Sequence, residues 1–215
     1  MSRLDDLLAR NRSWSDRVNA EDPDFFVRLS QQQAPEYLWI GCSDSRVPAN
    51  QVIDVAPGQV FVHRNVANVV SPSDLNCLSV IQFAVDVLKV EHIIVVGHYG
   101  CGGVQTVLED RRFGLVDNWL QHVRDVRQKH APMIDALDPT SRVDRLCELN
   151  AIEQAANVCH TTVIRDAWMR GQNLTVHAWC YSLRNGLVRD IGLDADNIDD
   201  APTQYDRAIS KLSAP

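Results

Sequence analysis

The chain has 215 residues, of which 45% are hydrophobic and 23% are charged. These proportions are ordinary for a folded globular protein and exclude a disordered chain. The length fits one domain with a large hydrophobic core. The formal net charge of −7 argues against a nucleic-acid partner, because a surface that binds phosphate backbones has to be positively charged.

No apolar stretch approaches the ~20 residues that a membrane-spanning helix needs, so we expect no membrane partner. The N-terminal segment MSRLDDLLAR carries two aspartates, where a secretory signal peptide has positive charge followed by an apolar run. We therefore expect a cytoplasmic protein whose six cysteines are reduced.

The apolar pattern predicts an N-terminal helix over 4–18 and a second short helix after Pro23. Short apolar runs then alternate with helical segments. The expected strands are 37–41, 59–63, 92–97 and 175–183. The expected helices are 75–88, 115–129, 142–170 and 205–212. This alternation predicts a single α/β domain over 1–215, with a small, mostly parallel central sheet that helices flank and cover on both faces.

Two clusters of polar residues directly follow two of the expected strands. The first is GCSDSR at 41–46, and the second is GHYGCGG at 97–103. Because ligands bind at the carboxyl ends of the strands in an open parallel sheet, both clusters lie at the expected edge. Cys42, His98 and Cys101 supply two thiolates and an imidazole. This is a set of three protein ligands for one Zn²⁺ ion, with a fourth position left open.

Asp44 and Arg46 follow Cys42 at intervals of two residues. The carboxylate of Asp44 can be the fourth ligand or a proton acceptor, and Arg46 can hold it off the metal through two parallel hydrogen bonds. The site is therefore either open, with a bound water molecule, or closed by Asp44. Two thiolates neutralise the charge of Zn²⁺, so we expect a weakly acidified water and an activity that rises with pH.

With these motifs the sequence resembles the β-class carbonic anhydrases. CSDSR at 42–46 and HYGCGG at 98–103 match the two zinc motifs of that family in order and spacing. FVHRNVAN at 61–68 and the later segment HAWCYSLRNG extend the likeness to about residues 30–190. The resemblance implies reversible hydration of CO2 to bicarbonate and a proton, with zinc-bound hydroxide as the nucleophile.

The resemblance also implies roles for individual residues. It implies zinc ligation by Cys42, His98 and Cys101, a catalytic dyad of Asp44 and Arg46, and substrate contacts from Gln33, Gly102 and Gly103. In the family the glutamine reaches the substrate across a dimer interface. The minimal unit is then a homodimer, or a dimer of dimers is formed, with residues 1–35 as a helical arm that packs on the partner subunit.

Three scattered residues resemble a non-catalytic bicarbonate pocket found in one bacterial subgroup of the family: Trp39, Arg64 and Tyr181. Arg64 offers an anion-binding fork, while the other two supply NH and OH donors. In that subgroup Asp44 moves onto zinc at lower pH, and bicarbonate favours this closed, inactive state. The resemblance therefore implies an allosteric switch that depends on pH and bicarbonate.

Two alternatives stay open. The chain could be a zinc hydrolase of the same fold that acts on CS2 or COS, or a non-catalytic zinc protein that binds bicarbonate. An intact Asp44–Arg46 pair argues against the second alternative, since a sensor has no need of a carboxylate that can leave the metal. The other six histidines have no cysteine or carboxylate partner at ligand spacing, so we expect surface or core roles for His63, His92, His122, His130, His160 and His177.

Overall fold

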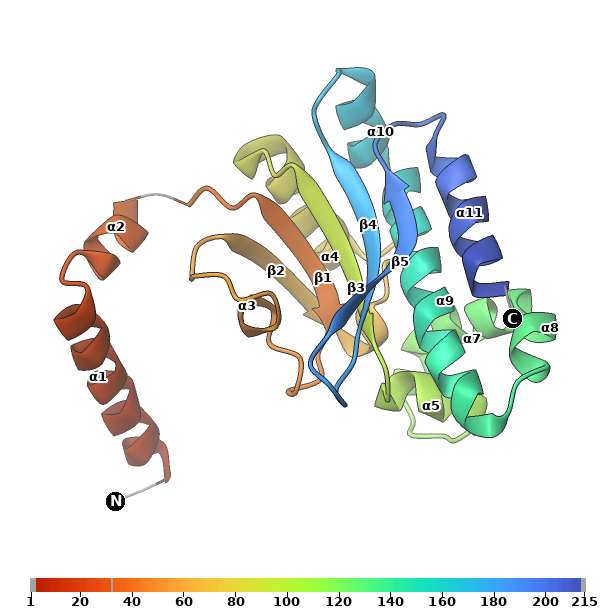
Figure 1. The fold of residues 1–215 in the computed structure, drawn as a ribbon, viewed down its shortest axis with the longest axis horizontal. Helices are drawn as coiled ribbons and strands as arrows, with labels where there is room; N and C mark the ends of the chain where they lie inside the picture. Colours follow the sequence, from red (N-terminus) through yellow and green to blue (C-terminus); the bar gives the residue numbers. More distant parts are fainter. Residues whose placement is uncertain (1–2, 32, 214–215) are drawn as a thin grey trace. The chain divides into compact units, whose positions relative to one another are not determined.

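The computed structural model describes residues 3–31 and 33–213, and the chain divides into two compact units, Met1–Ala34 and Pro35–Pro215. The first unit contains α1 (Arg3–Glu21) and α2 (Phe25–Gln31) (Figure 1). Trp14 meets the ring of Phe26 edge to face at 5.5 Å. Neither helix has a buried residue, so the described part of this unit has no hydrophobic core.

The second unit is built on a five-stranded sheet in the order β2-β1-β3-β4-β5 (Figure 1). The strands are β1 (Tyr37–Cys42), β2 (Val60–Asn65), β3 (His92–His98), β4 (Thr175–Tyr181) and β5 (Val188–Ala195). The first four are parallel, and β5 runs antiparallel to β4. The predicted α/β class and mostly parallel sheet are confirmed.

Helices and short helical turns connect the strands. They are α3 (Ala49–Val52), η1 (Val66–Asn68), α4 (Leu75–Gln82), η2 (Phe83–Leu88), α5 (Gly102–Leu108), α6 (Val116–Trp119), α7 (Gln121–Lys129), α8 (Ala131–Asp135), α9 (Pro139–His160), α10 (Thr162–Met169) and α11 (Ala201–Ser213). Within the described residues, none of them combines the length and the hydrophobicity needed to span a bilayer.

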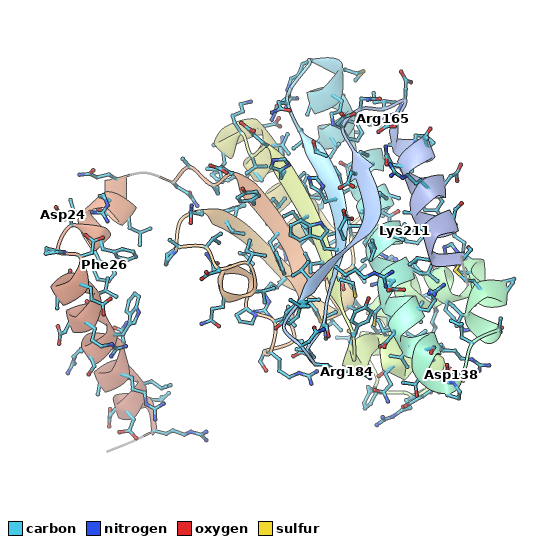
Figure 2. All side chains as sticks on the ribbon, viewed as in Figure 1. Asp24, Phe26, Asp138, Arg165, Arg184 and Lys211 are labelled. Carbon is cyan, nitrogen blue, oxygen red and sulfur yellow. The ribbon has the colours of Figure 1, made fainter. Side chains whose placement is uncertain are left out.

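Three predicted helices are each divided in the structure. The predicted helix 75–88 becomes α4 and the π-helical segment η2. The predicted helix 142–170 is divided into α9, which ends at His160, and α10, which begins at Thr162. The division falls at Thr161, which has an extended backbone and whose hydroxyl caps α10 by accepting a hydrogen bond from the N–H of Ile164. The predicted helix 115–129 is divided at Leu120 into α6 and α7. The start of α9 is well defined, since the carboxylate of Asp138, labelled in Figure 2, accepts hydrogen bonds from two backbone N–H groups.

Helices cover the two faces of the sheet to different extents. Leu38 and Ile40 of β1 point into the main core, which α4, α5, α7, α9, α10 and α11 complete. Trp39 points to the opposite face, into a smaller cluster that includes Val47 and Ala49 around α3. The alternation along β1 thus separates a helix-covered face from a lightly covered one.

Candidate metal centre

The carboxyl ends of β1 and β3 bring three sulfur and nitrogen donors together. Cys42 is the last residue of β1, His98 is the last residue of β3, and Cys101 directly precedes α5. Their ligand atoms lie within 4.8 Å of one another, and the two sulfur atoms are 3.9 Å apart. β1 and β3 are parallel neighbours, so residues at their carboxyl ends meet at one edge of the sheet.

Several observations show that this group fits a Zn²⁺ ion. Nε2 of His98 is buried and has no hydrogen-bond partner, although buried polar atoms are normally satisfied. Its other ring nitrogen lies 3.2 Å from the backbone oxygen of Tyr99, an arrangement that orients a histidine ligand. Two sulfurs and one imidazole nitrogen are the donors that zinc prefers.

The protein also stabilises negative charge on one of the two sulfur atoms, that of Cys42. A hydrogen bond from the Cys101 thiol lowers the pKa of Cys42 to about 4, with further contributions from His98 and from the backbone N–H groups of Asp44 and Ala67. The same pair raises the pKa of Cys101, while the N–H of Val104 opposes that shift. The site thus favours the thiolate of Cys42 even before a cation is bound. A bound cation would stabilise the second thiolate, that of Cys101.

Arg46 binds the carboxylate of Asp44 beside the three donors. Its Nε donates to Oδ1 at 2.9 Å and its terminal nitrogen donates to Oδ2 at 2.7 Å, while the backbone N–H of Arg46 also donates to Oδ1 at 2.9 Å. These hydrogen bonds hold the pKa of Asp44 well below its usual range. Oδ2 also lies 3.8 Å from Nε2 of His98, so a small movement would bring the carboxylate to the metal centre.

The two glycines at the start of α5 differ in their surroundings. A Cβ atom added to Gly102 would meet nothing within 4 Å, whereas one added to Gly103 would lie 3.2 Å from Leu120 and 3.3 Å from Val66 and Ala67. Gly102 therefore borders open space beside Cys101, and Gly103 permits close packing of α5 against η1.

The three residues of the expected bicarbonate pocket share one face of the sheet. Trp39 and Tyr181 both belong to the smaller cluster, and Arg64 pairs with Gly41, two residues after Trp39 on the same side of β1. The indole Nε1 of Trp39 is buried without a partner. The guanidinium of Arg64 donates to the backbone oxygen of Cys42 at 2.8 Å and to that of Asp44.

Gln33 lies in the first unit and is exposed, so it is not among the residues that the second unit brings to the metal centre. Three of the other six histidines contact cysteine or carboxylate side chains that do not lie at ligand spacing in the sequence. His63 lies beside Asp74 and Cys77, Nε2 of His130 is 2.6 Å from Glu153, and Nδ1 of His177 is 2.5 Å from Asp194. The partners are distant in the sequence, so ligand spacing gave no signal. The contribution of the Ala67 backbone to the lowered pKa of Cys42 was missed for the same reason.

The fold and the site define an α/β protein with a Cys-His-Cys group that could hold a metal ion beside an Asp–Arg pair. A family model described as carbonic anhydrase matches residues 37–188. The chain is 45% identical over 195 residues to a carbonic anhydrase of Emericella nidulans, which covers 90% of this chain and 86% of that one.

Two solved structures agree with this match. A β-carbonic anhydrase of Coccomyxa in complex with acetazolamide has a TM-score of 0.90 and 39% identity, with 100% of both chains covered. One of two tetrameric β-carbonic anhydrases from the filamentous ascomycete Sordaria macrospora has a TM-score of 0.85 and 40% identity, with 89% of this chain and 98% of that chain covered. The chain belongs to the β-class carbonic anhydrase family and is an enzyme of that type.

Proposed function

We propose that the chain catalyses the reversible hydration of CO2 to bicarbonate and a proton at a zinc ion held by Cys42, His98 and Cys101. The observation that carries this proposal is the buried, unpartnered Nε2 of His98, which lies with two thiols at the edge of the sheet. A bound zinc ion would act there as a Lewis acid that lowers the pKa of water and so supplies a nucleophile for CO2.

We assign to Asp44 and Arg46 the control of the fourth position at the metal centre. While Arg46 holds the carboxylate, Asp44 stays ionised and can accept a proton from a neighbouring water molecule. Without that hold, the carboxylate 3.8 Å from Nε2 of His98 would be free to occupy the position itself. The dyad therefore distinguishes an open state from a closed, inactive one.

For the substrate we propose a place beside Gly102, whose missing Cβ leaves open space next to Cys101. We propose that backbone N–H groups at the start of α5 bind a developing bicarbonate anion, because an α-helix N-terminus attracts negative charge. Gly103 supports this geometry by allowing α5 to pack against Val66 and Ala67. Gln33 would contribute a polar contact from a second copy of the chain.

The oligomer we propose is a homodimer, or a dimer of dimers, in which residues 1–35 pack on the partner subunit. The support is that α1 and α2 bury none of their residues while exposing several apolar side chains. These are Leu4, Leu7, Leu8, Trp14, Val27 and Leu29. Exposed apolar surface of this kind marks an interaction site, and the related Sordaria macrospora enzyme is tetrameric.

A bicarbonate pocket formed by Trp39, Arg64 and Tyr181 is the regulatory part of the proposal, and it would place the chain in the subgroup that has one. The orphaned Nε1 of Trp39 supports it, since a buried donor without a partner is available to an anion. Arg64 also donates to the backbone oxygens of Cys42 and Asp44. An anion that binds this guanidinium would break its hydrogen bond to the backbone oxygen of Asp44. Asp44 would then be free to move toward the metal centre, so bicarbonate binding would favour the closed state.

We further propose that the protein works in a reducing compartment such as the cytoplasm. All six cysteines are free and buried, which is typical of proteins kept reduced. The substrate assignment is tested by measuring turnover of CO2, CS2 and COS by the zinc-loaded protein under identical conditions. Turnover of CO2 above that of the other two supports the proposal. Turnover of CS2 or COS alone identifies a hydrolase of the same fold, and zinc and bicarbonate binding without any turnover identifies a sensor.

A further inference from the structure

Glu148 of α9 is a buried carboxylate held by two arginines. The residue is 4% exposed, and a buried charge is stable only where it is paired and hydrogen-bonded. Oε1 accepts a hydrogen bond from Nη1 of Arg189 at 2.7 Å, and Oε2 lies 3.2 Å from Nε of Arg145. Arg145 also donates to the backbone oxygen of Leu212 in α11. Contacts with Arg189 of β5 and, through Arg145, with α11 thus fix the position of the carboxylate.

The third partner of Glu148 is a tyrosine in the loop that carries two of the metal donors. Tyr99 lies between His98 and Cys101. Its hydroxyl donates to Oε1 of Glu148 at 2.7 Å. Its ring packs against the main core, and its backbone N–H donates to the backbone oxygen of Tyr181 at 2.9 Å. The side chain and the backbone of this tyrosine are therefore held by two different elements, α9 and β4.

The backbone oxygen of Tyr99 is the group that orients the imidazole of His98. It lies 3.2 Å from Nδ1 of the ring, and because a carbonyl oxygen only accepts hydrogen bonds, Nδ1 carries the proton. Nε2 is the nitrogen left for a metal ion, and it is buried without a partner. A hydrogen bond of this kind fixes both the tautomer and the ring orientation of a ligating histidine. The position of Tyr99 therefore sets the direction in which Nε2 points.

Two glycines of this segment differ in how closely other groups approach them. A Cβ added to Gly97 would lie 3.0 Å from the backbone oxygen of Cys147 and 3.3 Å from the Cβ of Ala151, so α9 packs directly on the end of β3. Gly100 has φ +71° and a Cβ added there would meet nothing within 4 Å. Packing thus fixes the start of the segment but leaves space beside its glycine-rich end, where the backbone has more conformational freedom. The hydrogen bond to Glu148 restrains this freer part.

We propose that Glu148 is a positioning residue of the metal centre, which acts through Tyr99 to aim Nε2 of His98 at the metal. The carboxylate holds the tyrosine hydroxyl, and the tyrosine backbone oxygen holds Nδ1 of the imidazole. Glu148 needs no contact with the metal ion for this role. The inference rests on the proposed zinc function of Cys42, His98 and Cys101.

The test begins with Tyr99→Phe, which removes only the hydroxyl. The ring can stay in the core and Glu148 keeps both arginines, so this variant should fold. The full-length protein is loaded with Co²⁺, whose visible ligand-field absorption reports the arrangement of the ligands around the ion. We expect this absorption to change, and zinc affinity in a chelator competition to fall about tenfold. Glu148→Ala, which removes the acceptor, should change both quantities in the same direction.

Tyr205→Phe is the matched control. The hydroxyl of Tyr205 also donates to a buried glutamate of α9, Glu153, whose other partners are His130 and Lys129. The same kind of hydrogen bond is lost, but none of these residues belongs to the metal centre. We expect a loss of stability similar to that of Tyr99→Phe, with unchanged cobalt absorption and zinc affinity.

Glu148→Gln separates the hydrogen bond from the charge. The glutamine keeps a carbonyl acceptor for the hydroxyl of Tyr99 but no longer neutralises Arg145 and Arg189. We expect lower stability with cobalt absorption close to that of the wild type. Unchanged absorption and affinity in both Tyr99→Phe and Glu148→Ala, or equal changes in Tyr205→Phe, would overturn the inference. A wild-type protein that shows no absorption from cobalt bound to sulfur would instead refute the zinc proposal itself.

Discussion

Arg46 and Asp44 form a two-point ion pair next to the metal centre, with hydrogen bonds of 2.9 and 2.7 Å between the guanidinium and the two carboxylate oxygens. The side chain of Arg46 is 59% exposed, whereas that of Asp44 is 16% exposed. The carboxylate of Asp44 is thus largely buried, while the side chain of Arg46 is mostly in solvent. Arg46 can therefore move away and release the carboxylate.

Arg46→Ala should retain zinc and lose activity by about a hundredfold or more, because the freed Asp44 would occupy the fourth position. Arg46→Lys keeps the positive charge but cannot form the two parallel hydrogen bonds to Asp44, so we expect a similar loss of activity. Arg170→Ala removes another partly exposed Arg–Asp pair, with Asp86, and should leave turnover unchanged. Stopped-flow hydration assays with parallel zinc analysis check this, and full turnover in Arg46→Ala would count against the dyad.

Cys42→Ala should abolish stoichiometric zinc binding, since a histidine and one thiol remain. Cys159→Ala is the matched control. Cys159 is also buried, but burial raises its pKa to about 12, so it stays a neutral thiol and should not affect metal content. Atomic absorption on purified protein measures both variants. Full zinc occupancy in Cys42→Ala would disprove its assignment as a ligand.

Gly41→Ala should disturb the proposed bicarbonate pocket without replacing any of its three residues. An added Cβ would lie only 2.3 Å from Nε1 of Trp39, so the indole has to move, at a cost of about 1–3 kcal/mol in stability. We expect inhibition by added bicarbonate to weaken in this variant, as in Tyr181→Phe. Unaltered inhibition in both variants would mean that the three residues serve only for packing.

Glu153 should make stability depend on acid pH. Burial alone would raise its pKa, but hydrogen bonds from His130, Tyr205 and Lys129 outweigh burial and lower the pKa from 4.5 to about 2. The stabilising contribution is complete above pH 4.5 and is lost as the pH falls from about 4.5 to about 2. It amounts to about 3 kcal/mol at most.

Urea unfolding at a series of pH values tests that contribution. The free energy of unfolding of the wild type should fall across this window more steeply than that of Glu153→Gln, which cannot ionise at this position. Parallel pH curves for the two proteins would show that Glu153 makes no such contribution.

Sequence could predict the sheet and the clustering of Cys42, His98 and Cys101. Each of the two motifs directly follows a continuous apolar strand. Parallel strands that are neighbours end at one edge, and the structure brings these donors within 4.8 Å. The break at Thr161 was not predicted, because the apolar pattern of α9 continues into α10 and a single capping hydroxyl ends the helix.

The contacts of Ala67 and of His63 with residues far along the chain could not be predicted either. They depend on how loops pack against α9 and α4, and neither periodicity nor ligand spacing describes such packing. The left-handed conformation of Ala67 has no signal in residue type, since alanine rarely adopts that region. Tertiary contacts determine it.

The central claim is that zinc at Cys42, His98 and Cys101 hydrates CO2 under the control of Asp44. Stopped-flow CO2 hydration by protein carrying one zinc ion per chain, scanned from neutral to mildly alkaline pH, tests it most directly. We predict weak turnover near neutrality that climbs steeply with pH. Equally strong turnover throughout would contradict the Asp44 switch, and no turnover at any pH would contradict the enzymatic function.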